Sequence, residues 1–121
     1  MGLTGTATMV VTADDTAIAM GSGAVPVLAT PRVVALCEQA TCAALDGHLP
    51  PDRTTVGIRV ELDHLQPTVV GRTVTAEAEL ETIEGRRFTF VVSASDDRGP
   101  IAVGRVTRAL VDLALFLEKA R

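Results

Sequence analysis

Two ionisable residues occur where the sequence predicts apolar surroundings. Glu38 lies in the middle of residues 30–45, the most apolar helix-like segment of the chain. His64 ends an alternating, strand-like run and should also face the interior. The other members of its predicted face are Val56, Ile58, Val60 and Leu62. Because polar groups are costly to bury and buried titratable groups are enriched where proteins perform chemistry, Glu38 and His64 predict a functional site.

The chemistry that fits these residue types is hydrolysis. A carboxylate bonded to one imidazole nitrogen fixes the tautomer and leaves the other nitrogen free to act as a base. Glu38 and His64 would supply two members of a hydrolytic triad, and Thr30, at the start of the same helix, has a hydroxyl for the third. Thr30 and Glu38 are eight residues apart (38 − 30), about 12 Å along a helix axis, so His64 would have to stand between them.

Each of these residues also has a purely structural interpretation. A Thr before a Pro most often caps a helix, and an inward His is most often a satisfied core residue. Glu38 could form a buried ion pair with an Arg such as Arg59 or Arg108. Gly57, which interrupts a β-branched strand, indicates either a β-bulge or a backbone that must come close to a ligand.

The first third of the chain predicts a strand, a long connection and a helix. Residues 4–12 alternate and are rich in β-branched types, so they predict a strand. Residues 13–29 show neither period and predict a lid or binding loop, or else a plain surface excursion. Thr30 as N-cap and Pro31 at the first helical position begin the helix, and Gly47 ends it. The helix is apolar on nearly every side, which indicates that other elements enclose it.

Four further strands follow the helix. They are predicted at residues 54–65, 73–82, 88–94 and 101–112. Turn residues at Glu84-Gly85 and at 96–100 keep the connections short, which favours an antiparallel meander. The predicted fold class is therefore α+β, with an antiparallel sheet wrapped around one long buried helix, the arrangement called a hot-dog fold.

Length and composition exclude several classes of function. The chain of 121 residues has no linker, repeat or low-complexity tract, so we expect a single domain over residues 1–121. Its net charge of −4, its 2% aromatic content and its scattered Arg residues argue against a nucleic-acid partner. No apolar run is long enough to span a bilayer and no targeting segment is evident, so we expect no membrane partner and a cytoplasmic protein. Cys37 and Cys42 fit neither a metal site nor a disulfide framework, so both are interpreted as core residues, and no metal or other cofactor is expected.

The chain also resembles a known family, the fluoroacetyl-CoA thioesterases and their relatives among the hot-dog thioesterases. The resemblance rests on the Thr30-to-Glu38 spacing and on the step of 26 residues (64 − 38) from Glu38 to His64. Four segments also follow the family pattern, and these are residues 64–71, 84–96, 101–111 and 117–119. Together they cover most of the chain from the predicted lid onward.

The resemblance implies an activity, a set of site residues and an assembly. It implies an acyl-CoA thioesterase in which Thr30, Glu38 and His64 are catalytic. It implies that Gly57 and Arg108 contact the acyl-CoA substrate. It also implies a homodimer whose two sheets join edge to edge, with each active site near the subunit interface.

The predicted lid departs from the family pattern, because residues 21–26 carry no aromatic side chain. We therefore expect a short or medium acyl group other than fluoroacetyl. His64, oriented by Glu38, would take a proton from Thr30 or from a water bonded to Thr30, and the sequence leaves both nucleophiles open. The alternative is a non-catalytic acyl-CoA binding or sensing module on the same fold, since a fold does not fix a function.

Overall fold

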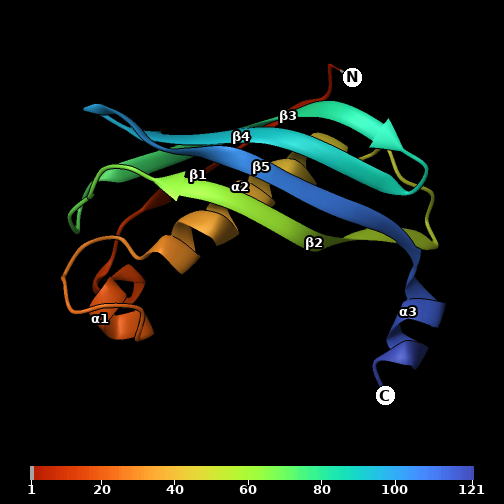
Figure 1. Cartoon of the computed structure of the whole chain (residues 1–121), viewed down its shortest axis with the longest axis horizontal. Coiled ribbons are helices and arrows are strands. Elements are labelled where there is room, and N and C mark those ends of the chain that lie inside the picture. The colour runs from red at the N-terminus through yellow and green to blue at the C-terminus, as the bar shows by residue number, and fades with distance from the viewer. Residues whose placement is uncertain (1) are drawn as a thin grey trace.

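One long helix lies along the concave side of a five-stranded antiparallel sheet in the computed structural model, which describes residues 2–121 (Figure 1). The strands are β1 (Thr4–Val10), β2 (Arg53–His64), β3 (Thr73–Glu84), β4 (Arg87–Asp96) and β5 (Gly99–Asp112). The helices are η1 (Ala13–Asp15), α1 (Ala17–Met20), α2 (Thr30–Leu45) and α3 (Leu113–Lys119). α1 lies near the beginning of α2, and α3 lies at the opposite end of the molecule (Figure 1). No helix of residues 2–121 is both long and apolar enough to cross a membrane.

The order of strands across the sheet is β1-β3-β4-β5-β2. β3, β4 and β5 form the predicted meander, joined by short turns. The prediction of a meander of four consecutive strands is wrong for β2, which pairs with β5 and not with β3. Because β2 takes the edge beside β5, residues 65–72 must cross the ends of β5 and β4 before the chain can enter β3. We call residues 65–72 the crossover connection.

The inner face of the sheet is built largely from small aliphatic side chains. Val74, Ala76, Ala78 and Leu80 of β3 are buried, as their alternation predicted. α2 contacts all five strands. Its approach to β1 is so close that a Cβ added to Gly5 would overlap backbone atoms of Ala40 and Ala44. The position of α2 is therefore fixed by backbone contact as well as by side-chain packing.

α2 has the predicted length, but its first residue has a different role from the predicted one. The N-cap residue is Ala29, and Thr30 makes no capping hydrogen bond, so the prediction that Thr30 caps the helix is wrong. Gly47 follows the last turn with a φ of +78°, the left-handed conformation that glycine adopts readily. Cys37 is buried, whereas Cys42 is exposed, so the interpretation of both cysteines as core residues holds only for Cys37. In the single chain, α2 is thus covered on the sheet side and open on part of the other.

A β-bulge in β2 changes which side chains face α2. Gly57 pairs with Arg108 and Arg59 pairs with Thr107, which leaves Ile58 as the extra residue. Directly paired residues share a face of the sheet, and Arg108 contacts α2. Gly57 therefore faces the helix before the bulge, although the sequence predicted that its neighbours Val56 and Ile58 would do so.

After the bulge, β2 returns to the predicted phase. Val60 is opposite the buried Val106, and His64 is opposite the buried Ala102, so both face α2. Val60 is still 38% exposed and Ile58 is 46% exposed, because β2 is an edge strand. The prediction of an interior apolar row along β2 is therefore wrong for Val56 and Ile58 in orientation, and wrong for Val60 in burial.

Candidate active site

The first residue of α2 and the last residue of β2 meet in a hydrogen bond. Thr30 Oγ1 lies 2.8 Å from His64 Nδ1. When the Thr30 hydroxyl donates, Nδ1 accepts and the ring carries its proton on Nε2. This is the arrangement in which an imidazole can remove the proton of a hydroxyl group. The structure thus brings together two of the three residues predicted to be catalytic.

The environment of His64 favours the neutral imidazole. Burial lowers the pKa of His64 below its ordinary value, and the nearby backbone of Gln66 opposes this only in part. Nε2 is buried and makes no hydrogen bond that meets normal geometry with any of residues 2–121. His64 therefore has the protonation state of a general base near neutral pH, together with one ring nitrogen whose bonding capacity is unused.

A cavity of about 290 Å³ adjoins this pair. Thr30 and His64 are both part of its wall. The remaining lining residues are Ala17, Ser22, Gly23, Val25, Val27, Leu28, Ala29, Leu65, Gln66 and Pro67. Residues 13–29 therefore form one wall of the cavity, as the lid interpretation predicted, and the start of the crossover connection forms another. Aliphatic side chains dominate on the first wall, while His64 and Gln66 add polar groups to the second.

Glu38 has a different partner. Its Oε2 accepts from Nη1 of Arg108 over 3.2 Å. Arg108 also donates from Nε to Thr55 Oγ1 over 2.9 Å and from Nη2 to the Thr55 carbonyl over 3.1 Å. The side chain of Arg108 is 8% exposed and that of Glu38 is 34% exposed, so the guanidinium is buried while the carboxylate still meets solvent. The ion-pair interpretation of Glu38 is thus correct for Arg108, while Arg59 instead contacts Glu61 over 3.3 Å.

Gly57 allows Glu38 to lie against β2. A Cβ at this position would overlap the carboxylate of Glu38. The bulge interpretation of Gly57 is confirmed, since the register shifts immediately after it. The close approach that glycine permits is made here by a carboxylate of the same chain.

Glu38 does not reach His64 within one chain. It lies over Gly57, which is seven residues (64 − 57) before His64 along β2, or roughly 20 Å at the rise of an extended strand. Within residues 2–121 no hydrogen bond joins Glu38 to His64. The predicted site residues therefore form two groups, with Thr30 and His64 at the cavity and Glu38, Gly57 and Arg108 farther along β2.

Sequence reasoning missed Thr55 as the partner that holds Arg108. The alternation of the sequence did not indicate Thr55, because the bulge puts the odd-numbered residues of the first half of β2 on the helix side. Among residues 2–121, no group of three or more His, Cys, Asp or Glu side chains is arranged to hold a metal ion.

Comparison with known proteins identifies the family. Residues 11–114 match the family model described as fluoroacetyl-CoA-specific thioesterase. The chain belongs to this family. It is 38% identical over 95 residues to the fluoroacetyl-CoA thioesterase of Streptantibioticus cattleyicolor, a match that covers 78% of this chain and 68% of the relative. As a member of this thioesterase family, it is a thioester hydrolase.

Solved structures agree with the family and the fold. A fluoroacetyl-CoA thioesterase structure superposes with a TM-score of 0.94 at 32% identity, covering 100% of this chain and 94% of that one. A variant of the fluoroacetyl-CoA-specific thioesterase, in complex with fluoroacetate and CoA, superposes with a TM-score of 0.89 at 33% identity, covering 96% of this chain and 98% of that one. A thioesterase superfamily member from Thermus thermophilus superposes with a TM-score of 0.88 at 28% identity, covering 98% of this chain and 91% of that one. The predicted family resemblance and the hot-dog fold are therefore confirmed.

Proposed function

We propose that this thioesterase hydrolyses a short or medium acyl-CoA, with Thr30 and His64 as its reacting pair. The observation that carries the proposal is the 2.8 Å hydrogen bond between Thr30 Oγ1 and His64 Nδ1 in the wall of the cavity. Small-molecule pockets are usually ~300–1,000 Å³, so a cavity of about 290 Å³ suits an acyl group better than a whole CoA. Its aliphatic lining suits an alkyl chain.

In the proposed reaction, neutral His64 takes a proton from Thr30 or from a water bonded to Thr30. The nucleophile adds to the thioester carbonyl, the C–S bond breaks, and the protonated imidazole can protonate the departing thiolate. If Thr30 is the nucleophile, the acyl group is left as an ester on Thr30 Oγ1, and a water that gives its proton to His64 then hydrolyses this ester to release the acid and restore the hydroxyl. The developing oxyanion needs donors already in place. Pro31 has no N–H, while Arg32 and Val33 donate to the Ala29 carbonyl, so the N–H of Thr30 is the donor at the beginning of α2 that we assign to the oxyanion.

The third member of the proposed triad is Glu38 of a second copy. β2 is an edge strand, and pairing two copies of it antiparallel about a two-fold axis would place Gly57 of one beside His64 of the other if the axis passed near residue 60.5, the mean of 57 and 64. Glu38, which lies over Gly57, would then face the His64 ring of the other copy. Nε2 is covered in the single chain, so the proposed contact requires the atoms that cover it to move when the two copies pair. A carboxylate accepting from Nε2–H would fix the tautomer that the Thr30 hydrogen bond requires. The homodimer and its edge-to-edge joining are thus part of the proposal.

Gly57 and Arg108 have a supporting role in this scheme. Arg108 holds the carboxylate of Glu38, and Gly57 leaves room for it. A direct contact of either residue with the acyl-CoA stays a prediction from the family resemblance. A cytoplasmic location stays a prediction from the sequence.

The test is a panel of acyl-CoAs from acetyl to decanoyl, including fluoroacetyl-CoA, with release of free thiol as the readout. Turnover should be highest for a short or medium chain, and His64→Ala should lower kcat by about 10²- to 10⁴-fold. His48→Ala is the matched control, because His48 is exposed and outside the cavity. Tight binding of an acyl-CoA without thiol release would instead identify a binding or sensing module. Neither binding nor release would show the proposal to be wrong.

A further inference from the structure

A buried carboxylate lies at the end of β4, outside the proposed triad. The side chain of Asp96 is only 1% exposed. Such a group is costly to bury unless its oxygens are satisfied. Oδ1 accepts from the backbone N–H of Arg98 over 2.8 Å. Oδ2 accepts from Thr68 Oγ1 over 2.9 Å and from Arg98 Nη2 over 3.1 Å.

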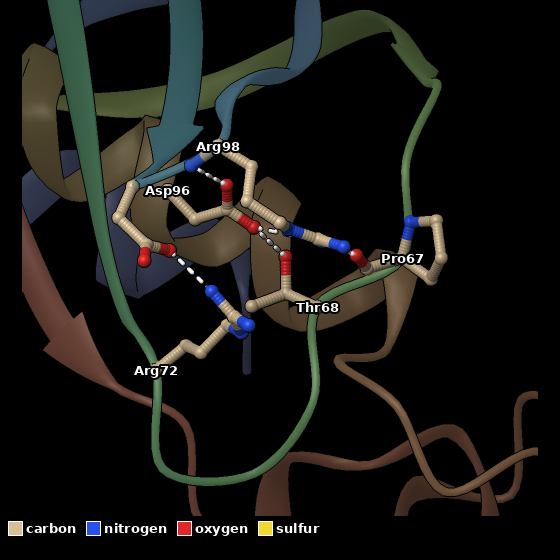
Figure 2. A network of polar contacts seen from close by, with 6 residues as sticks. Pro67, Thr68, Arg72, Asp96 and Arg98 are labelled. Atoms are coloured by element: carbon tan, nitrogen blue, oxygen red, sulfur yellow. Dashed lines mark hydrogen bonds and ion pairs between the residues drawn. The ribbon is translucent and has the colours of Figure 1, made fainter.

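These bonds tie the turn between β4 and β5 to the crossover connection (Figure 2). Thr68 lies in the connection and is fully buried. The guanidinium of Arg98 binds Asp96 and also donates to the Pro67 carbonyl, so two consecutive residues of the connection are held. The topology explains the contact, because the connection has to cross the β4–β5 end of the sheet.

The held segment leads directly to both reacting residues. On one side, Pro67 is three residues after His64, and the backbone of the intervening Gln66 contacts the imidazole. On the other side, the Thr68 carbonyl accepts from the N–H of Leu28 over 2.8 Å, two residues before Thr30. Both reacting residues are therefore linked to Asp96 through one or two hydrogen bonds and a short stretch of backbone, four residues (68 − 64) to His64 and two (30 − 28) to Thr30.

The charge of Asp96 is maintained despite burial. Burial alone would raise the pKa of Asp96, but the hydrogen bonds from Arg98 and Thr68, together with the charge of Arg98, hold it below the ordinary value. Asp96 is thus a permanent anion near neutral pH that accepts three donors. A nearby exposed pair, Arg72 and Asp97, joins the same turn to the far end of the connection over 2.6 Å, where solvent screening makes it weak (Figure 2).

We propose that Asp96 is a positioning residue for the active site, which clamps the crossover connection through Thr68 and Arg98 and thereby sets the contact between Thr30 and His64. This inference rests on the proposed function for its effect on turnover. The clamp itself is a statement about the geometry of His64 and can be tested without activity.

The experiment compares Asp96→Asn with Asp97→Asn, two identical chemical changes at adjacent positions. Asp96→Asn should lower kcat by on the order of 10-fold or more with little change in KM, because a small misplacement of a catalytic group is costly. Asp97→Asn removes only the exposed ion pair with Arg72, and its kcat should stay within about twofold of the wild-type value. Thr68→Val and Thr68→Ser form a second pair, in which only the valine removes the hydroxyl that binds Asp96.

The decisive readout is the titration of His64 followed by NMR. The chain has two histidines, so the exposed His48 serves as an internal reference. In the Glu38→Gln background, where no carboxylate of a second copy acts on the ring, Asp96→Asn and Thr68→Val should raise the midpoint of His64 toward the ordinary value of about 6.5 as the ring gains solvent, while Asp97→Asn and Thr68→Ser should leave it unchanged.

A purely structural Asp96 would give a different result. The variants would lose stability in urea, yet kcat and the His64 titration would match wild type, and the inference would be overturned. Should Asp96→Asn not fold, the Thr68 pair decides alone. If wild-type protein hydrolyses no thioester, the proposed function fails, but the His64 titration still decides whether the clamp exists.

Discussion

Glu38 and Arg108 form an ion pair over Gly57, with 3.2 Å between Oε2 and Nη1, while His64 bonds Thr30 at the other end of β2. A single chain therefore holds the members of the proposed triad in two places. The proposal that a second copy supplies the carboxylate rests on two features, the His64 Nε2 that makes no hydrogen bond within residues 2–121 and the edge position of β2.

Mixing two inactive variants tests whether Glu38 acts across the dimer. In a heterodimer of Glu38→Gln and His64→Ala, one site would have both residues intact and the other would have neither. Equal mixing gives half heterodimers, so thiol release should recover to about a quarter of the wild-type rate per subunit for a two-fold dimer. Each variant alone should stay near its own low rate. Failure to recover after complete subunit exchange, checked by mass spectrometry, would mean that Glu38 and His64 do not cooperate between subunits.

Replacing Gly57 with alanine should push the Glu38 carboxylate away from Arg108, because the new Cβ would occupy its place. We expect kcat to fall by on the order of 10-fold, with a small change in stability because the displaced atoms end a flexible side chain. When Gly57→Ala is added to Glu38→Gln, kcat should fall by less than about twofold further, as expected for coupled residues. Equal losses in both backgrounds would show that Gly57 acts independently of Glu38.

The pH dependence of kcat/KM should report His64. In Glu38→Gln, which lacks the proposed carboxylate of the second copy, burial disfavours the imidazolium, so the pKa of His64 is lowered and the acid limb should have its midpoint below the ordinary value of about 6.5. The wild-type acid limb should lie higher, because a carboxylate beside Nε2 favours the imidazolium. The sign for stability follows from the same shift. The unfolded chain binds the proton more readily, so the free energy of unfolding should fall as the pH drops through 6.5 and into the lowered range. An acid limb of Glu38→Gln at or above 6.5 for kcat/KM, measured with a substrate that does not titrate, would contradict this assignment.

Substituting Arg108 should destabilise the fold more than substituting an exposed arginine. Arg108→Met leaves Thr55 and Glu38 without their donor. We expect the free energy of unfolding, measured in urea, to fall by roughly 1–3 kcal/mol. This is less than for a fully enclosed ion pair, because the side chain of Glu38 is 34% exposed. Arg105→Met is the matched control, since Arg105 on the outer face pairs with Glu81 in solvent and should contribute little. Indistinguishable unfolding curves for the two variants would show that Arg108 has no special structural role.

Local patterns predicted the elements well where packing agrees with periodicity. The alternation over 73–82 predicted the buried face of β3 correctly, and the apolar run from Thr30 with Gly47 behind it predicted α2. Thr30 and His64 could be singled out because their types are unusual at their places. Their contact could not be derived from local rules, since it joins residues 34 apart through the tertiary fold.

The errors have physical causes in the pairing of strands. A single extra residue at Ile58 reverses the faces of β2, so the sequence pattern placed Val56 toward the helix in place of Gly57. The edge position of β2 depends on its pairing with β5, which alternation does not encode. Asp is a residue type that is common in turns, so the local sequence did not indicate that Asp96 is buried. Its side chain is buried because residues 65–72 cross this end of the sheet and Thr68 binds its carboxylate.

The place of β2 in the sheet also determines when the molecule can become active during folding. β2 precedes β3 in the chain but pairs with β5, so β5 must be in place before β2 can join the sheet and bring His64 to Thr30. Closing such a long loop is entropically slow compared with forming hairpins between consecutive strands. Newly made chains should therefore form most of their sheet before they form a competent active site. The contact between His64 and Thr30 should be among the last to be completed during folding.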